Sequence, residues 1–192
     1  MKIGLFFGSF NPIHRGHLKI ASYFLDNSNL QEIWLVVSPK NPLKEDAELL
    51  DVKKRLELVH AAIGENERIK CCEVELGMPL PSFTIDTLRE LRNTNPNDEF
   101  IIIMGSDNLE KFHLWKDYTE ILDQYKIYVY PRSGASSGQF AAHPSVSLID
   151  SQLLEISASM LRDQIRKEEF DLWLPDKVAQ IIRERGYYSN SG

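Results

Sequence analysis

The chain has 192 residues, of which 43% are hydrophobic, and this length supports one domain with a sizeable core. Its net charge of −6 comes without long blocks of like charge, which argues against a nucleic-acid groove, so any anion site must be a local cluster. The opening MKIGLFFGSF lacks an export signal, and no apolar run approaches the roughly 20 residues that span a bilayer. We therefore expect a cytoplasmic protein with neither a nucleic-acid nor a membrane partner.

Short apolar runs with the character of buried strands recur along the chain. They are Lys2–Phe7, Glu32–Ser38, Ile69–Val74, Glu99–Met104, Lys126–Tyr130 and Val146–Ile149. Between the first four runs, apolar residues recur with helical spacing, within residues 18–25, 52–62 and 85–91. The alternation predicts an α/β fold with a Rossmann-like, doubly wound parallel sheet of five to six strands, covered on both faces.

The C-terminal part is predicted to be helical from about Ser157. One apolar stripe runs through Met160, Leu161 and Ile165, and a second helix is expected to stop at Gly186. We expect a single domain over residues 1–192, with a sheet-based core in residues 1–150 and a helical end in residues 151–188.

The cysteines and three of the histidines give no functional signal. Cys71 and Cys72 are adjacent, a spacing that strains an intrachain disulfide and supplies too few thiolates for a structural zinc site. His60, His113 and His143 show no partnering pattern, so we expect them to be structural. A reducing compartment and no metal site built from protein ligands are the resulting expectations.

The stretch GSFNPIHRGH directly follows the first predicted strand. Gly8 allows close approach of backbone to a ligand, while Ser9 and Asn11 offer short polar groups. Pro12 discourages an early helix, which we expect to begin near Gly16.

His14 and His17 then straddle the N-terminus of that helix. Free N–H groups and the helix dipole favour anions there, and two imidazoles three residues apart can converge on one phosphate. Two alternatives stay open: the histidines cap local backbone, or they ligate a metal, for which no nearby third ligand is evident.

A second polar turn, Gly105-Ser106-Asp107-Asn108, follows the apolar run at Ile101–Met104. Ligands of doubly wound sheets bind beyond the carboxyl ends of the strands, where the winding reverses. If the two strands are neighbours, this turn and the loop at Gly8 open on one crevice. Asp107 could also be only an N-cap.

The segment ISASMLR, Ile156 to Arg162, predicts a helix start with anion-binding chemistry. Ser157 can cap the helix, Ser159 lies in its first turn, and Arg162 projects a turn later, so the segment can hold a polyphosphate. An ordinary capped helix is the alternative. The phosphate loop GxxxxGK[ST], a GxGxxG turn after a strand, and the GxSxG elbow are absent, so nucleotide binding must use another device.

The two histidines lie in a segment that resembles the HxGH signature of the nucleotidyltransferase superfamily. ISASMLR is similar to its C-terminal ISxTxxR motif, with Ser159 in the threonine place. More narrowly, the chain resembles bacterial nicotinate-nucleotide adenylyltransferases from Lys2 to about Tyr187. Further matches are Pro42-Leu43-Lys44, PSFTIDTL at 81–88, IMGSDNL at 103–109, WKDY at 115–118 and Trp173-Leu174-Pro175.

The resemblance implies that the chain transfers the adenylyl group of ATP to nicotinate mononucleotide, giving deamido-NAD and pyrophosphate in NAD biosynthesis. His14, His17 and Arg162 would be catalytic, and Mg²⁺ would be held mainly by the ATP phosphates. The implied ATP-binding residues are Gly8, Ser9, Phe10, His14, His17, Lys44, Gly105, Asp107, Ile156, Ser157 and Arg162.

For the mononucleotide, the resemblance places Phe83 and Thr84 beside the pyridine ring, Trp115 stacked on it, and Arg132 on the 5′-phosphate. The implied set is Asn11, Lys44, Phe83, Thr84, Trp115 and Arg132. Each has an alternative: Trp115 as ordinary core, Thr84 as a helix cap, and Lys44 and Arg132 as solvated charges. Asn11 departs from the superfamily, which often has an aspartate there.

Two other functions stay open. One is an adenylyltransferase with another phosphorylated acceptor, such as nicotinamide mononucleotide or phosphopantetheine. The other is a nucleotide sensor without turnover, although such a sensor needs no transition-state charge contacts. A homo-oligomer is neither indicated nor excluded by the sequence.

Overall fold

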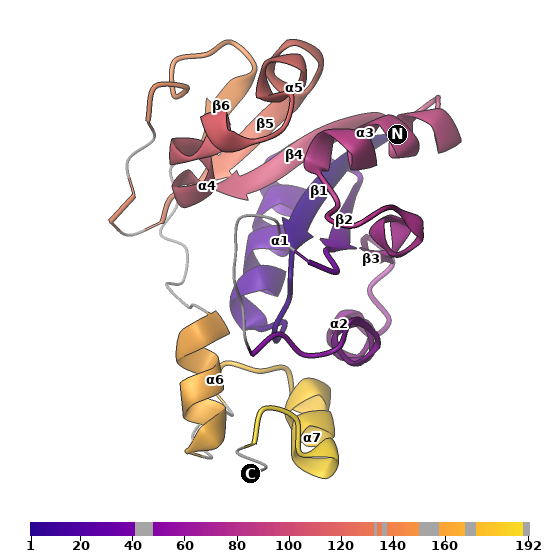
Figure 1. Cartoon of the computed structure of the whole chain (residues 1–192), viewed down its shortest axis with the longest axis vertical. Coiled ribbons are helices and arrows are strands. Elements are labelled where there is room, and N and C mark those ends of the chain that lie inside the picture. Colours follow the sequence, from indigo (N-terminus) through magenta and orange to yellow (C-terminus); the bar gives the residue numbers. More distant parts are fainter. Residues whose placement is uncertain (41–47, 133, 136–137, 150–157, 168–171, 190–192) are drawn as a thin grey trace.

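The structure is a computed structural model that describes residues 1–40, 48–132, 134–135, 138–149, 158–167 and 172–189 (Figure 1). Its parallel strands form one sheet in the order β3-β2-β1-β4-β5-β6. The strands are β1 (Lys2–Gly8), β2 (Glu32–Val37), β3 (Ile69–Cys72), β4 (Glu99–Gly105), β5 (Lys126–Tyr130) and β6 (Val146–Leu148). This is a doubly wound order whose winding reverses between β1 and β4, and it confirms the predicted Rossmann-like α/β fold.

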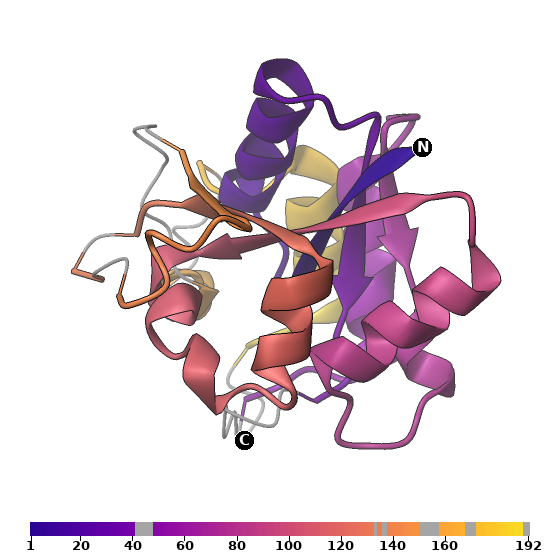
Figure 2. The ribbon, with the colours of Figure 1, turned by 90° about the horizontal axis from the view of Figure 1, so that it is seen from above.

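Helices cover both faces of the sheet (Figure 2). They are α1 (Arg15–Asn27), α2 (Val52–Ile63), α3 (Thr84–Thr94), α4 (Ser106–Glu110), α5 (Tyr118–Gln124), α6 (Ala158–Arg166) and α7 (Asp176–Arg185), with 3-10 turns η1 (Val74–Gly77) and η2 (Phe112–Leu114). Helices α1, α2, α6 and α7 bury apolar side chains in one core, whereas α3, α4 and α5 contribute to the other. The strands between are buried on both sides, which explains why their apolar residues do not alternate.

The structure tests several predicted boundaries. Strand β3 ends at Cys72, and Val74 begins η1 instead of extending the strand. Helix α1 begins at Arg15, as expected from the predicted start near Gly16. The end of α7 at Gly186 is confirmed, because that glycine adopts a left-handed φ of 64°.

The neighbouring positions of β1 and β4 bring two loops together. In the β1–β4 register Phe6 lies opposite Ile103, so the loop after Gly8 and the turn after Gly105 start at the same edge of the sheet. Helices α6 and α7 lie at the end of the molecule toward which β1 runs (Figure 1). Among the helices described, none combines the length and apolar character needed to cross a membrane.

Candidate functional site

The loop between β1 and α1 is held in place by Asn11. The Asn11 side chain is buried; its Nδ2 donates to the carbonyl of Glu48 (3.1 Å), while its Oδ1 accepts from the Leu50 N–H (3.1 Å) and from the Tyr188 hydroxyl (2.8 Å). Both ends of the amide therefore have internal partners, from segments distant in the sequence. This network explains the uncharged side chain, because a carboxylate cannot donate to Glu48.

Arg55 is a site-supporting residue that the sequence analysis missed. Its guanidinium, from α2, is 1% exposed and donates to four backbone carbonyls. The acceptors are Leu50, Ser9, Ser38 and Pro39, at 2.8, 2.5, 2.9 and 2.9 Å. The helical spacing could have predicted its burial, because position 55 lies on the same helix face as the apolar residues at positions 52, 56 and 59. Arg55 thus fixes the loop after β1 to the end of β2.

His14 and His17 meet at the start of α1. Their rings stack with centroids 3.7 Å apart, and the Nδ1 of His17 accepts from the His14 N–H at 3.3 Å. The predicted backbone-capping role is therefore present for His17, and it coexists with the convergence of the two imidazoles. Phe10 packs edge-on against His17 and is itself buried, so its ring helps to hold the His17 imidazole in place.

His14 is uncharged at neutral pH. Burial and the nearby positive charge of Arg132 lower the pKa of His14 to about 3. Its Nδ1 is buried and makes no hydrogen bond within the described part of the chain. A phosphate bound here would raise this pKa, because an anion stabilises the imidazolium.

Side chains lie close to Gly105 at the second turn. A Cβ at Gly105 would meet Asp107 Oδ1 and would lie 3.0 Å from Arg132 Cγ. The Arg132 N–H donates to Ser106 Oγ (2.9 Å), and its guanidinium donates to the hydroxyl of Tyr130 (3.3 Å). The N-cap of α4 is Gly105, so the alternative that Asp107 caps this helix is wrong.

Arg162 connects α6 to the first loop. Its Nη1 donates to the carbonyl of Asn11 (2.9 Å), and its Nε donates to a Glu48 carboxylate oxygen (3.1 Å). The other Glu48 oxygen accepts from Arg166 (3.1 Å). Arg162, the residue of α6 that was predicted to contact the polyphosphate, therefore lies against the loop that carries the histidines. Arg162 and Asn11 are 151 positions apart in the sequence.

An open cleft of about 300 Å³ lies beside this loop. It is lined by the ends of β1 and β2, by the start of α3, and by α4 with the segment after η2. The lining residues include Gly8, Ser9, Phe83, Thr84, Asp107 and Trp115, all of which were predicted site residues. The cleft is therefore built from both predicted binding sets.

Two of the residues expected at the pyridine ring, Phe83 and Thr84, lie at the N-terminus of α3. Phe83 is the N-cap of α3, so the alternative that Thr84 caps this helix is wrong; Thr84 is its first residue. The first N–H groups of a helix have no intrahelical acceptor and can bind an anion. Trp115 is half-buried, and its ring centroid lies 5.2 Å from that of Phe112. Trp115 also lines the cleft, so one side of it packs on the core and another side is available to a ligand.

A buried carboxylate braces this side of the cleft. Glu75 of η1 is 2% exposed and accepts from the hydroxyls of Ser82 (2.6 Å) and Thr87 (3.0 Å). These two residues flank Phe83 and Thr84, so Glu75 fixes the segment that enters α3. Sequence spacing gave no signal for it, because η1 is too short to show a period.

Three predicted site residues, Lys44, Ile156 and Ser157, lie outside the described residues. Seven of the other predicted residues fall into two groups: His14 and His17 with the guanidinium groups of Arg132 and Arg162, and the more apolar cleft with Phe83, Thr84 and Trp115. Together they suit a ligand with several negative charges beside a flat ring.

The chain is similar in sequence to known proteins. Residues 5–164 match the family described as cytidylyltransferase-like. The protein named probable nicotinate-nucleotide adenylyltransferase of Cytophaga hutchinsonii is 44% identical over 99% of this chain and 100% of its own length. The protein of the same name in Flavobacterium johnsoniae is 41% identical over 98% of this chain and 99% of its own length.

A solved structure shares the fold. The nicotinic acid mononucleotide adenylyltransferase of Plasmodium falciparum, complexed with NaAD, superposes with a TM-score of 0.83 over 97% of each chain, at 19% identity. This likeness concerns the fold alone, whereas the match to the family and the bacterial relatives covers the sequence as well. The chain therefore belongs to the cytidylyltransferase-like family and to the nicotinate-nucleotide adenylyltransferases within it.

Proposed function

We propose that this protein is a nicotinate-nucleotide adenylyltransferase that transfers AMP from ATP to nicotinate mononucleotide, releasing pyrophosphate. The observation that carries the proposal is the stacked pair of His14 and His17 at the N-terminus of α1, with Arg162 bonded to the same loop. An anion site at the point where the sheet winding reverses, beside an aromatic cleft, suits two phosphorylated substrates.

The reaction needs positioning and charge compensation more than covalent catalysis. The 5′-phosphate of the mononucleotide attacks the α-phosphorus of ATP in line, the new P–O bond forms as the bond to the β-phosphate oxygen breaks, and pyrophosphate leaves. His14, His17 and Arg162 would meet the ATP phosphates, and charge on the leaving group would be offset by Arg162 and by the imidazoles. When a polyphosphate binds, Glu48 would lose its hydrogen bond to Arg162, because the Glu48 carboxylate and the polyphosphate are both anions and compete for the same guanidinium.

Further ATP contacts follow from the family resemblance. Gly8, Ser9 and the Phe10 backbone would line the nucleotide, and Gly105 and Asp107 would meet the adenosine, where a carboxylate can accept ribose hydroxyls. Lys44, Ile156 and Ser157 complete this set.

The cleft would hold the mononucleotide. Trp115 would stack on the pyridine ring, Phe83 would lie beside it, and backbone N–H groups near Thr84 would bind the nicotinate carboxylate. Arg132 would bind the 5′-phosphate, an anion that its guanidinium can hold with two hydrogen bonds. We assign Asn11 to holding the loop and not to direct substrate contact, because its amide is committed to internal partners.

Magnesium fits this site as a substrate-borne ion. Among the described residues, the one group of three or more metal-ligating side chains lies away from the cleft. Mg²⁺ keeps several waters and binds readily to nucleotide phosphates, so the chain has only to hold those phosphates. When bound, the ion would supply charge neutralisation on the phosphate oxygens.

We also infer that the chain acts as one domain in the cytoplasm. Hydrogen bonds from Arg162 and Tyr188 to Asn11 support the single domain, since they join the C-terminal helices to the first loop. Cys71 and Cys72 are free cysteines, which a reducing compartment would keep as thiols.

The proposal is tested by product analysis. Purified protein is incubated with ATP, Mg²⁺ and nicotinate mononucleotide, and the mixture is resolved by mass spectrometry. Deamido-NAD should form only when both substrates are present, and a His17→Ala variant should form it about a hundredfold more slowly. ATP binding without any such product would instead favour the sensor.

A further inference from the structure

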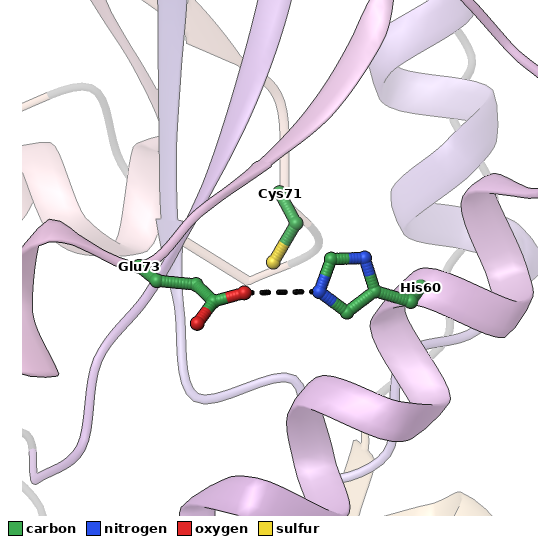
Figure 3. Close-up of side chains that lie close together, drawn as sticks. All are labelled: His60, Cys71 and Glu73. Carbon is green, nitrogen blue, oxygen red and sulfur yellow. Dashed lines mark hydrogen bonds and ion pairs between the residues drawn. The ribbon is translucent and has the colours of Figure 1, made fainter.

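His60, Cys71 and Glu73 converge at the outer edge of the sheet (Figure 3). His60 comes from the last turn of α2, Cys71 from the edge strand β3, and Glu73 follows that strand. The Nε2 of His60 lies 3.0 Å from a Glu73 carboxylate oxygen, and the Cys71 sulfur points toward the same space. One ligand atom from each of the three lies within 4.8 Å of the other two.

We propose that His60, Cys71 and Glu73 form a binding site for a Zn²⁺-like divalent metal ion, with water as the fourth ligand. Imidazole nitrogen, thiolate sulfur and carboxylate oxygen are the three donors that zinc takes from proteins. Magnesium and calcium prefer oxygen ligands alone, so the sulfur and nitrogen select a transition metal.

The geometry is close to that required. Zinc bonds of about 2.0–2.3 Å in a tetrahedron place ligand atoms roughly 3.3–3.8 Å apart. The side chains of His60 and Glu73 are 58% and 46% exposed, so both can shift by the remaining distance, and a metal can enter from solvent. Their contact offers little resistance, because a contact between two exposed polar side chains contributes little to stability.

The site is separate from the proposed catalytic cleft, since none of its three residues lines that cleft. It would join the end of α2 to the segment leading into η1. Cys71 packs on the core face shared with α2, whereas Cys72 belongs to the core on the opposite face. The adjacent cysteine therefore serves as a matched control.

Metal binding at this site should release a proton. Burial and the nearby Glu73 raise the pKa of the Cys71 thiol to about 12, so the metal-free protein carries a neutral thiol at pH 7. Zinc binds the thiolate, and the displaced proton passes to solvent.

The test uses the full chain, stripped of metal by a chelator, kept reduced, and titrated with CoCl₂. The wild type should develop visible bands of tetrahedral Co²⁺ and a near-ultraviolet thiolate-to-cobalt band, which ZnCl₂ then bleaches. Cys71→Ser should lose the thiolate band and Cys72→Ser should keep it. His60→Ala and Glu73→Gln, both exposed changes, should weaken Zn²⁺ binding at least about tenfold.

Circular dichroism and thermal melting confirm that each variant is folded before titration. Absence of a thiolate band in the wild type at saturating Co²⁺ would overturn the site. So would a thiolate band that survives Cys71→Ser, or Zn²⁺ affinity unchanged in both His60→Ala and Glu73→Gln. None of these readouts depends on catalytic turnover.

Discussion

The hydroxyl of Tyr188 donates a 2.8 Å hydrogen bond to Oδ1 of Asn11, a residue 177 positions earlier in the chain. Asn11 in turn donates to the carbonyl of Glu48 and accepts from the N–H of Leu50. The loop that carries the histidine pair is thus braced by the C-terminal segment and by the residues before α2. This bracing requires a side chain that is both donor and acceptor.

Asn11→Asp should destabilise the protein at pH 7. The substitution places a carboxylate oxygen against the Glu48 carbonyl, which loses its donor, and we expect the free energy of unfolding to fall by about 1–3 kcal/mol. Urea denaturation measures the change. Tyr188→Phe, which removes one hydrogen bond from the same oxygen, should cost about 1 kcal/mol. An aspartate variant as stable as the wild type would refute the donor role.

Arg55→Met should cost about 3 kcal/mol or more, because it leaves four partly buried carbonyl oxygens without their charged donor. Chemical denaturation gives the value. Lys53→Met, an exposed change on the same helix, should stay within about 0.5 kcal/mol of the wild type. Equal stability of the two variants would show that Arg55 does not hold the loop.

His14 should make stability depend on pH in a defined window. The unfolded chain binds this proton near pH 6.5 and the folded chain only near pH 3, so between these values the unfolded state holds more protons. The free energy of unfolding therefore falls as the pH falls, by about 1.4 kcal/mol per unit from this group. The slope of stability against pH between about 5 and 6.5 should be smaller in His14→Asn. Equal slopes would mean that His14 is not buried in its neutral form.

His17→Ala should lower kcat about a hundredfold while the fold persists, because a contact to developing phosphate charge is lost. Steady-state pyrophosphate release measures the rate, and circular dichroism checks the fold. His113→Ala, at an exposed position in η2, is the control and should turn over normally. Near-normal turnover of His17→Ala would remove this residue from the catalytic set.

Trp115→Ala should raise KM for nicotinate mononucleotide and leave KM for ATP nearly unchanged, because stacking on one ring is lost. Trp115→Phe, which keeps an aromatic face, should recover most of the affinity. Initial rates at varied concentrations of each substrate give the two constants. An unchanged KM for the mononucleotide in the alanine variant would argue against stacking.

The sequence predicted the sheet because its strands are continuous apolar runs, a pattern that burial on both faces requires. It also placed the histidine loop and the turn at Gly105 on one crevice, since the motifs follow strands that prove to be neighbours. Short elements such as α4 and α5 were missed, because five to seven residues show too little periodicity.

The supporting residues of the site were harder to predict. Arg55 and Glu75 are buried charges whose partners are backbone carbonyls and hydroxyls from other segments, and only the folded chain reveals those partners. The pairing of His60 with Glu73 was not predicted for the same reason, since the two residues come from different parts of the chain. Long-range hydrogen bonds leave no local pattern in the sequence, whereas sequence motifs and the periodic spacing of apolar residues can be recognised locally.

Adenylyl transfer to nicotinate mononucleotide is tested most directly by measuring pyrophosphate release with ATP, Mg²⁺ and one acceptor at a time. The acceptors are nicotinate mononucleotide, nicotinamide mononucleotide and phosphopantetheine. We predict sustained release with nicotinate mononucleotide and none with phosphopantetheine. Release only with phosphopantetheine, or with none of the three, would contradict the proposed function.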